Sequence, residues 1–276
     1  MKLYISMDLE GIAGVSFWHD IKKGSSDFKY FKNIVTEQVN NICKSLFERY
    51  KSLDKITICD SHSYGENLIY DNLIENVELI KGFPRKYYMM EGLDEGYAGI
   101  IYLGYHVGIG KVGNLDHTYS SSKIYEIKIN GKEMNEFYIN SFLASEYEIP
   151  IISLISGDKL INELKEKHDS IEYIVTKNEI GKFSAKMKNY NNLTKEISER
   201  IRLFKDLNLY STIKPKYPLN VEINLTNTKF AEVASLIPKI KRKGGRNIQF
   251  NVKSMKKFYK LLMAVIFISN GVSNVE

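Results

Sequence analysis

The sequence predicts an α/β fold in which a mostly parallel sheet is covered by helices and is followed by a smaller C-terminal α+β domain. Two observations lead to this prediction. Short apolar strands alternate with helical segments through the first two thirds of the 276 residues, as in sheets whose strands are joined by helical crossovers. The last third reads as a small α+β unit around a Pro-containing linker at residues 214–218. We therefore expect a larger domain over residues 1–190 and a smaller one over residues 191–276.

The expected elements follow from local patterns. The chain opens with a strand that contains Leu3, Tyr4 and Ile5, and residues 16–26 form a loop. A long helix comes next, because apolar residues recur every three or four positions from Phe28 to Leu46. Further strands are expected at residues 55–59, 77–80, 98–103 and 150–155, with helices near 67–73 and 134–147 and a hairpin that turns at residues 130–131. In the last third we expect helices at residues 191–206, 228–235 and 253–268 and strands at residues 220–225 and 247–252.

Composition excludes several classes of protein. A hydrophobic content of 43% and a charged content of 26% are ordinary for a soluble globular protein. Cys43 and Cys59 show no CxxC spacing and are expected to be reduced and buried. The N-terminus lacks the pattern of a signal peptide, and the longest apolar run, residues 261–268, is too short to span a bilayer. We expect a cytoplasmic protein with no membrane partner.

The net charge of +6 does not indicate a nucleic-acid-binding protein. Lys and Arg are spread over the whole chain. The one dense basic run, residues 239–243 with Arg246, lacks interleaved aromatic residues and belongs to no recognisable nucleic-acid module. We interpret it as a solvated loop and expect no nucleic-acid partner.

Ligand-type side chains follow three of the predicted strands. Asp8 and Glu10 come at the end of the first strand, Asp60 and His62 at the end of the strand at 55–59, and His106 after the strand at 98–103. The carboxyl ends of parallel strands form the edge where open α/β sheets bind ligands. Two buried carboxylates are unfavourable unless a cation lies between them. Mixed carboxylate and imidazole ligands suit zinc or a similar divalent metal.

Each of these residues alone has a structural explanation. Asp8 or Asp60 could cap a turn, and His106 could be a core histidine. An acid at Glu136, in the first turn of a predicted helix, is favoured by the helix macrodipole. We expect His19 and His168 at the surface. Together with His117, however, the acids and imidazoles come from four separate segments, and a two-metal hydrolytic site with a bridging carboxylate explains the whole set.

Five motifs occur in order along the chain: Ser6-Met-Asp8-Leu-Glu10-Gly-Ile, Asp60-Ser-His62-Ser, Met90-Glu-Gly-Leu-Asp94, Leu103-Gly-Tyr-His106 and His117-Thr. With these motifs the chain resembles a known family, the zinc D-aminopeptidases, which are self-compartmentalising peptidases also labelled dipeptide-transport proteins. The similarity is ordered and nearly constant in spacing from residue 1 to about residue 160, and it continues more weakly through the C-terminal third.

The resemblance implies two zinc ions per subunit, held by Asp8, Glu10, His62, His106 and Glu136, with Asp8 as the bridge. Placing Glu136 rather than Glu133 in this set requires one extra residue in the preceding hairpin, and Asn135 stands where the family has Gly. The resemblance also implies that His117 is catalytic.

The roles of two further residues follow from chemistry. In descriptions of the family, the histidine that corresponds to His117 is called a nucleophile. A histidine beside two metal ions could equally act as a base or stabilise the tetrahedral intermediate. Asp60 is the natural hydrogen-bonding partner that would orient His62.

The resulting hypothesis is a zinc aminopeptidase that hydrolyses short peptides, with D-selectivity implied by resemblance alone. The family also implies a homodecamer of two stacked pentameric rings. A two-metal phosphoesterase would use the same ligand types, although the ligand motifs lack a nearby Arg clamp. A binding protein that captures dipeptides without turnover is the other alternative, and the presence of His117 argues against it.

Overall fold

The computed structural model describes residues 1–93 and 96–274, and its centre is a six-stranded sheet. The strand order is β3-β2-β1-β4-β7-β8, and every neighbouring pair is parallel. The strands are β1 (Lys2–Met7), β2 (Lys55–Asp60), β3 (Val77–Ile80), β4 (Ile100–Leu103), β7 (Ile151–Ser156) and β8 (Glu172–Val175). The predicted α/β fold with a parallel sheet is confirmed.

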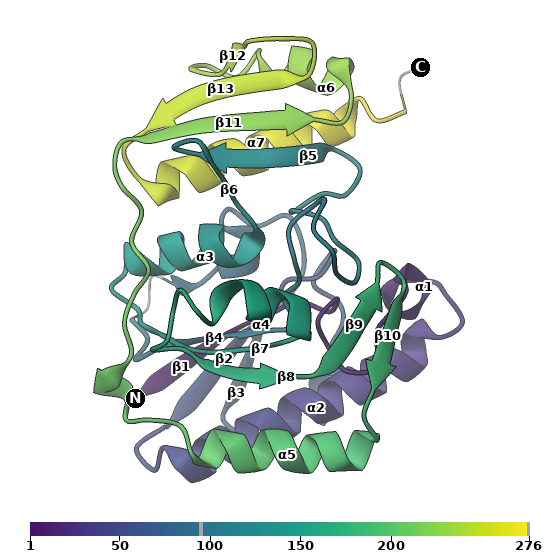
Figure 1. Ribbon diagram of the computed structural model, residues 1–276, viewed down its shortest axis with the longest axis vertical. Coiled ribbons are helices and arrows are strands. Elements are labelled where there is room, and N and C mark those ends of the chain that lie inside the picture. The colour runs from purple at the N-terminus through teal and green to yellow at the C-terminus, as the bar shows by residue number, and fades with distance from the viewer. Residues whose placement is uncertain (94–95, 275–276) are drawn as a thin grey trace.

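Helices cover both faces of this sheet (Figure 1). The covering helices are α2 (Phe28–Arg49), α3 (Glu136–Ser145), α4 (Asp158–Leu164) and α5 (Tyr190–Arg202), and the short helix α1 (Trp18–Ile21) packs on α2. Along β1, Leu3 and Ile5 belong to the apolar cluster that includes α2 and α5, whereas Tyr4 belongs to the cluster that includes α3. This alternation is the period of two expected for a strand buried on both sides.

A second, five-stranded sheet lies beyond α3 and has the order β12-β13-β11-β5-β6 (Figure 1). Its strands are β5 (Ile124–Ile129), β6 (Lys132–Glu133), β11 (Leu219–Leu225), β12 (Lys241–Arg242) and β13 (Asn247–Val252). Its pairs are antiparallel. Helices α6 (Thr228–Ala234) and α7 (Met255–Gly271) pack on it.

The predicted hairpin that turns at residues 130–131 is formed by β5 and β6 and belongs to the second sheet. Strand β5 pairs with β11, so the second sheet takes strands from both sides of the boundary expected at residues 190 and 191. Helix α5, just beyond that boundary, packs on α2 beside the first sheet. The division of the chain into residues 1–190 and 191–276 stays a prediction.

Several local features differ from the expected elements. The segment expected as a loop at residues 16–26 contains α1, and the short helix expected near residues 67–73 is a 3₁₀ turn at Tyr70–Asn72. The sequence analysis did not predict the hairpin of β9 (Lys177–Gly181) and β10 (Ser184–Met187). Further 3₁₀ turns are Tyr88–Met90 and Leu207–Leu209.

Three further expectations can be compared directly with the structure. Cys43 and Cys59 are buried and unpaired with each other. The basic run at residues 239–243 is largely exposed, but Lys241 and Arg242 form the edge strand β12 rather than a loop. Within the described ranges, none of the helices is long and apolar enough to cross a membrane.

Candidate metal centre

The strand ends of β1, β2 and β4 bring their ligand-type residues together. Met7 is in register with Asp60 on one side and Leu103 on the other, so Asp8, His62 and His106 all lie just beyond the same sheet edge. The backbone N–H of Asp8 donates to the carbonyl of Leu103 at 2.7 Å. The parallel register therefore places these side chains at one edge, as the sequence predicted.

Two glycines allow the segments after β1 and β4 to touch. A Cβ on Gly11 would lie 2.1 Å from the carbonyl oxygen of Tyr105, and a Cβ on Gly104 would lie 2.1 Å from that of Asp8. Gly104 also has a φ of +74°, which favours glycine. The N–H of Gly11 donates to the carbonyl of Gly104 at 2.7 Å. Any side chain at these positions would push Glu10 and His106 apart.

Glu136 reaches the same place from the first turn of α3. The side chain of Asn135, which precedes it, caps the helix by accepting a 3.0 Å hydrogen bond from the N–H of Tyr138. Asn135 is therefore the N-cap that positions Glu136 at the start of α3. Glu133, the alternative acid, is exposed on β6 and pairs with Lys111 at 2.8 Å. The structure therefore brings Glu136, and not Glu133, to the carboxylate and histidine cluster.

The ligand-type atoms of the cluster lie close to one another. His62 Nδ1 lies 3.3 Å from Asp8 Oδ1 and 3.2 Å from Glu10 Oε2. His106 Nε2 lies 3.6 Å from Asp8 Oδ2 and 3.7 Å from Glu136 Oε2. These contacts define two ligand groups that share Asp8, and in each group the ligand atoms lie within 4.8 Å of one another.

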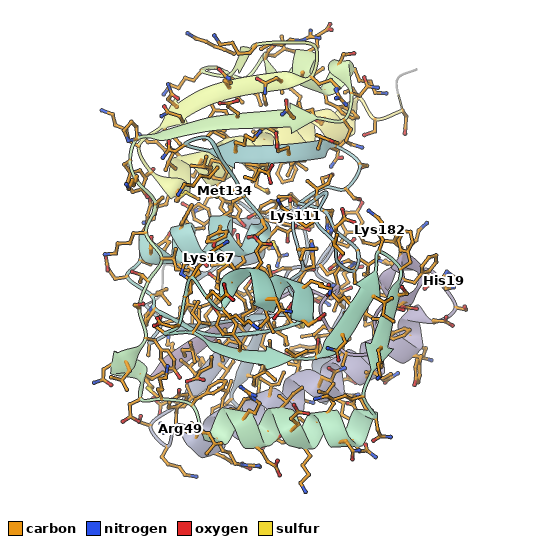
Figure 2. All side chains as sticks on the ribbon, viewed as in Figure 1. His19, Arg49, Lys111, Met134, Lys167 and Lys182 are labelled. Atoms are coloured by element: carbon orange, nitrogen blue, oxygen red, sulfur yellow. The ribbon has the colours of Figure 1, made fainter. Side chains whose placement is uncertain are left out.

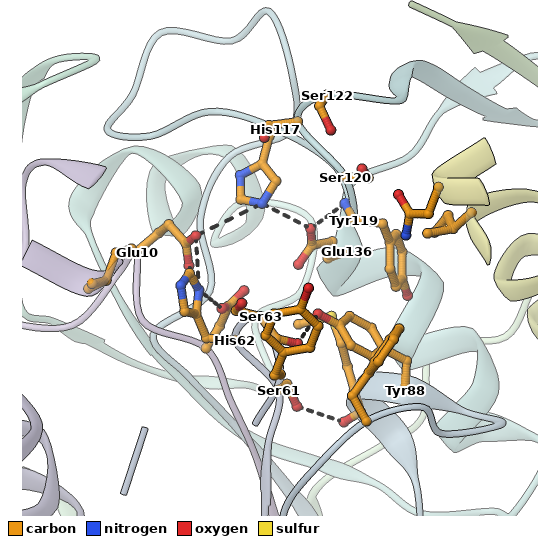
Figure 3. Close-up of a pocket in the computed structure, with 18 of the residues that line it drawn as sticks. Glu10, Ser61, His62, Ser63, Tyr88, His117, Tyr119, Ser120, Ser122 and Glu136 are labelled. Atoms are coloured by element: carbon orange, nitrogen blue, oxygen red, sulfur yellow. Dashed lines mark hydrogen bonds and ion pairs between the residues drawn. The ribbon is translucent and has the colours of Figure 1, made fainter. Parts of the chain in front are cut away.

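His117 lies against both groups. Its Nε2 is 3.9 Å from Glu10 Oε1 and 3.9 Å from Glu136 Oε1 (Figure 3). Its ring stacks on that of His106 with centroids 4.2 Å apart. A third ligand group consists of Glu10, His106 and His117. The six residues expected at the site are thus all in one cluster.

Backbone carbonyls fix which nitrogen of two imidazoles carries the proton. His106 Nδ1 lies 2.9 Å from the carbonyl of Val107, and His117 Nδ1 lies 3.0 Å from the carbonyl of Leu115. A carbonyl can only accept, so each Nδ1 donates and the lone pair of a neutral ring is on Nε2. In both residues this atom faces the carboxylates.

The electrostatics of the cluster are those of a site built for cations. Burial, followed by the charge of Asp8, raises the pKa of Glu136 well above its ordinary value. Burial, followed by the charge of Glu10, raises the pKa of Asp8. Burial alone would also raise the pKa of Glu10, but the neighbouring His62 outweighs it and the pKa is lowered. Burial, followed by His117, lowers the pKa of His106 to about 3, so its ring is neutral and able to act as a ligand.

Two buried atoms support the fit of a divalent cation. Glu10 Oε1 and His106 Nε2 are both buried and make no hydrogen bond within the described residues. Buried polar atoms without partners are rare in proteins. A carboxylate oxygen and an imidazole lone pair are both ligands that zinc accepts, and the cluster supplies three carboxylates and three imidazoles.

Asp60 supports the cluster differently from the expectation. Its carboxylate accepts hydrogen bonds from Asn67 N at 2.6 Å and Asn67 Nδ2 at 2.7 Å. The same amide donates to the carbonyl of His62 at 2.8 Å. Asp60 therefore acts on His62 through Asn67 and the backbone, rather than through the imidazole ring.

A cleft of about 750 Å³ opens in front of the cluster. Asp8, Glu10, His62, His117 and Glu136 line its polar side. The lining also includes a set of aromatic and apolar side chains, namely Tyr64, Phe83, Tyr88, Met263, Ile266 and Phe267. This volume suits a ligand of a few amino-acid residues.

The apolar side of the cleft is organised around Phe83. Its ring makes edge-to-face contacts with Tyr64 and Phe267, at centroid distances of 5.5 Å and 5.2 Å. Phe267 belongs to α7, so the second sheet and its helices contribute part of the cleft wall.

Some residues lie apart from the cluster, and others were not expected in it. His19, a residue of α1, is exposed at the outer edge of the molecule (Figure 2). His168 is half-buried beside Tyr138. Asp94, the last residue of one motif, lies outside the described residues.

The sequence analysis missed two residues that support the cluster. They are Tyr119, whose N–H donates to Glu136 Oε1 at 2.5 Å, and the buried Lys177. Neither residue belongs to a metal-ligand type that a motif search would select.

Comparison with known proteins gives a consistent result. Residues 1–264 match the M55 peptidase family, described as D-aminopeptidase. The chain is 26% identical over 272 residues to a D-aminopeptidase of Bacillus subtilis strain 168, with 96% of each sequence covered. It also superposes, at a TM-score of 0.91 and 24% identity over 98% of each chain, on the Zn-dependent D-aminopeptidase DppA from the same organism, described as a self-compartmentalizing protease.

The family match covers nearly the whole chain, and the family predicted from the five motifs is therefore confirmed. The expectation of an aminopeptidase is confirmed with it, and neither a phosphoesterase nor a non-catalytic binding protein is needed to explain the cluster. This chain belongs to the D-aminopeptidase (M55 peptidase) family.

Proposed function

We propose that this protein is a zinc-dependent aminopeptidase that hydrolyses short peptides with an N-terminal D-amino acid. The observation that carries the proposal is the pair of buried ligand groups that share Asp8 and open onto one cleft. One zinc ion would be held by Asp8, Glu10 and His62, and the other by Asp8, His106 and Glu136. When bound, two such ions act as Lewis acids that polarise the scissile carbonyl and make water a stronger nucleophile.

The protein's own residues would orient the substrate and move the proton. His117 Nε2 faces the cleft with its lone pair free, because Nδ1 donates to the carbonyl of Leu115. In that state His117 can accept a proton from the attacking water and return it to the leaving amine. The stacked ring of His106 and the edge of Trp18, at a centroid distance of 5.4 Å, hold the His117 ring in place.

The proposed selectivity for short peptides comes from assembly. The metal chemistry is the same at any peptide bond, so a preference for short substrates requires walls around the site. Two stacked pentameric rings of identical subunits would supply these walls, and closed symmetric assembly is common among soluble oligomers. The relative described as self-compartmentalizing supports this assembly for a chain of the same fold.

One set of measurements tests the proposal. Purified protein is expected to contain about two zinc ions per subunit, to sediment as a decamer, and to cleave D-alanyl dipeptides faster than their L-alanyl counterparts. Comparable rates on the D-alanyl and L-alanyl dipeptides would reject the proposed D-selectivity but not the aminopeptidase activity. Rapid cleavage of an unstructured protein, or full activity in a monomer, would reject the compartment. Protein that is inactive and binds no zinc would reject the metallopeptidase itself.

A further inference from the structure

Lys177, at the start of β9, is a lysine with 1% of its surface exposed, and its ammonium group contacts the backbone of Glu10. Its Nζ donates three hydrogen bonds, to the backbone carbonyls of Glu10 and Val15 and to Asn114 Oδ1 at 2.7 Å. All three acceptors are neutral. An ammonium group is expensive to bury, and burial is tolerated here because each of its protons has an acceptor.

The acceptors of Lys177 belong to the two loops that carry Glu10 and His117. Asn114 is fully buried and lies three residues before His117. While its Oδ1 accepts from Lys177, its Nδ2 donates to the carbonyl of Ser16 at 2.9 Å and to that of Lys182 at 2.8 Å. Lys177 and Asn114 therefore tie the loop after β1 to the loop before His117.

The residue before Lys177 contributes to the same arrangement. Thr176 Oγ1 donates to the carbonyl of Gly11 at 2.6 Å. The same residue, Gly11, also donates its backbone N–H to the carbonyl of Gly104. The backbone that carries Glu10 is thus held between the end of β4 and the start of β9.

We propose that Lys177, together with Asn114, is a positioning residue that fixes Glu10 relative to His117 and so sets the zinc affinity of the Asp8, Glu10 and His62 group. The inference rests on the proposed two-zinc function. The effect is selective, because the contacts of Lys177 run to the Glu10 and His117 loops, whereas His106 is held by Val107 and Glu136 by Tyr119. Groups that orient metal ligands commonly change metal affinity by about 10–100-fold when removed.

The test is Lys177→Met in the full-length protein, with zinc content measured across a series of buffered free-zinc concentrations. We expect the variant to retain one ion with wild-type affinity and to bind the second at least about 10-fold more weakly. At saturating zinc, kcat is expected to fall by at least about 10-fold with KM changed less than about threefold, since the cleft walls are untouched. Lys177→Arg, which keeps the charge and the donors, should recover part of both losses.

Lys123→Met is the matched control, because Lys123 is also buried and its Nζ lies over the ring of Phe230, away from the Glu10 loop. It should leave zinc binding and kcat unchanged.

If Lys177→Met does not fold, Thr176→Val and Asn114→Ser test the inference instead, and each is expected to weaken the binding of the same one zinc ion. Wild-type affinity for both ions in these variants, or parallel weakening of both, would overturn the inference. Wild-type protein that binds no zinc would instead overturn the proposed function.

Discussion

Replacing Glu136 with Gln is expected to change the stability of the protein in opposite directions with and without zinc. In the metal-free protein Glu136 is buried beside Asp8, and their nearest ligand atoms lie within 4.8 Å. Two full charges at that separation repel by about 3.5 kcal/mol at an effective dielectric constant of 20. Gln removes the charge and keeps nearly the same shape.

Smaller effects oppose this gain. A carboxylate in the first turn of α3 is stabilised by the helix macrodipole by about 0.3–1 kcal/mol. The hydrogen bond from the N–H of Tyr119 can be kept by the amide oxygen of Gln. Partial protonation of Glu136 also reduces the repulsion, because its pKa is raised by burial and by Asp8. We expect a net stabilisation of the metal-free protein by about 1–2 kcal/mol near pH 8.

In the presence of zinc, Glu136→Gln is expected to destabilise the folded protein instead of stabilising it. A ligand present at 100 times its dissociation constant stabilises the folded state by about 2.7 kcal/mol per site. The variant is expected to lose much of this stabilisation at the proposed zinc site that includes Glu136. The assay is denaturant unfolding with a chelator and with excess zinc, with Glu133→Gln as the matched control. Glu133 is exposed and paired with Lys111, so its variant should differ little from wild type in either buffer.

The pH dependence gives an independent check. The folded-state pKa of Glu136 is raised above its ordinary value of 4.5. The protonated form therefore stabilises the fold at low pH, and this contribution is lost as the pH rises through the folded-state pKa. The advantage of Glu136→Gln over metal-free wild type should grow over that window and vanish below about pH 4.5. A variant that is less stable than wild type in both buffers would refute the charge-repulsion argument.

Three further substitutions address catalysis, selectivity and coupling to α7. His117→Ala should keep both zinc ions but lower kcat by roughly 100-fold or more, measured by metal analysis and steady-state kinetics, and loss of zinc would make His117 a ligand. Phe83→Ala should raise KM for a D-phenylalanyl dipeptide by roughly 10-fold and that for a D-alanyl dipeptide much less, since only the larger side chain reaches the apolar wall. Tyr259→Phe removes hydrogen bonds to Tyr119 and Asn140, so unfolding should show a loss of about 1–2 kcal/mol, and an unchanged midpoint would contradict this.

The sequence was most informative where the fold itself aligns the residues. Asp8, His62 and His106 each follow an apolar strand, and parallel register brings the ends of adjacent strands to one edge. Their proximity could therefore be predicted from strand positions without knowing any contact. The same argument does not reach Glu136, because the chain first crosses to the second sheet through β5 and β6. Its placement depended on the resemblance to a family.

The supporting residues could not be predicted for a physical reason. A lysine at the start of a strand is normally exposed, and nothing near Lys177 in the sequence indicates that its charge is buried. Its partners are backbone carbonyls at residues 10 and 15 and an amide at residue 114, which are far away in the chain. Contacts of this kind leave no spacing pattern. The same holds for Tyr119, which acts on Glu136 through a backbone N–H.

The route of the chain to Glu136 links the metal cluster to the cleft wall. Strand β5 pairs with β11, and α3 begins three residues after β6. The hydroxyl of Tyr259 in α7 is hydrogen-bonded to Tyr119 and to Asn140. The backbone N–H of Tyr119 donates to Glu136, and Asn140 is a residue of α3. Helix α7 also lines the cleft with Met263, Ile266 and Phe267. A displacement of α7 is therefore expected to change the shape of the cleft and the position of Glu136 together.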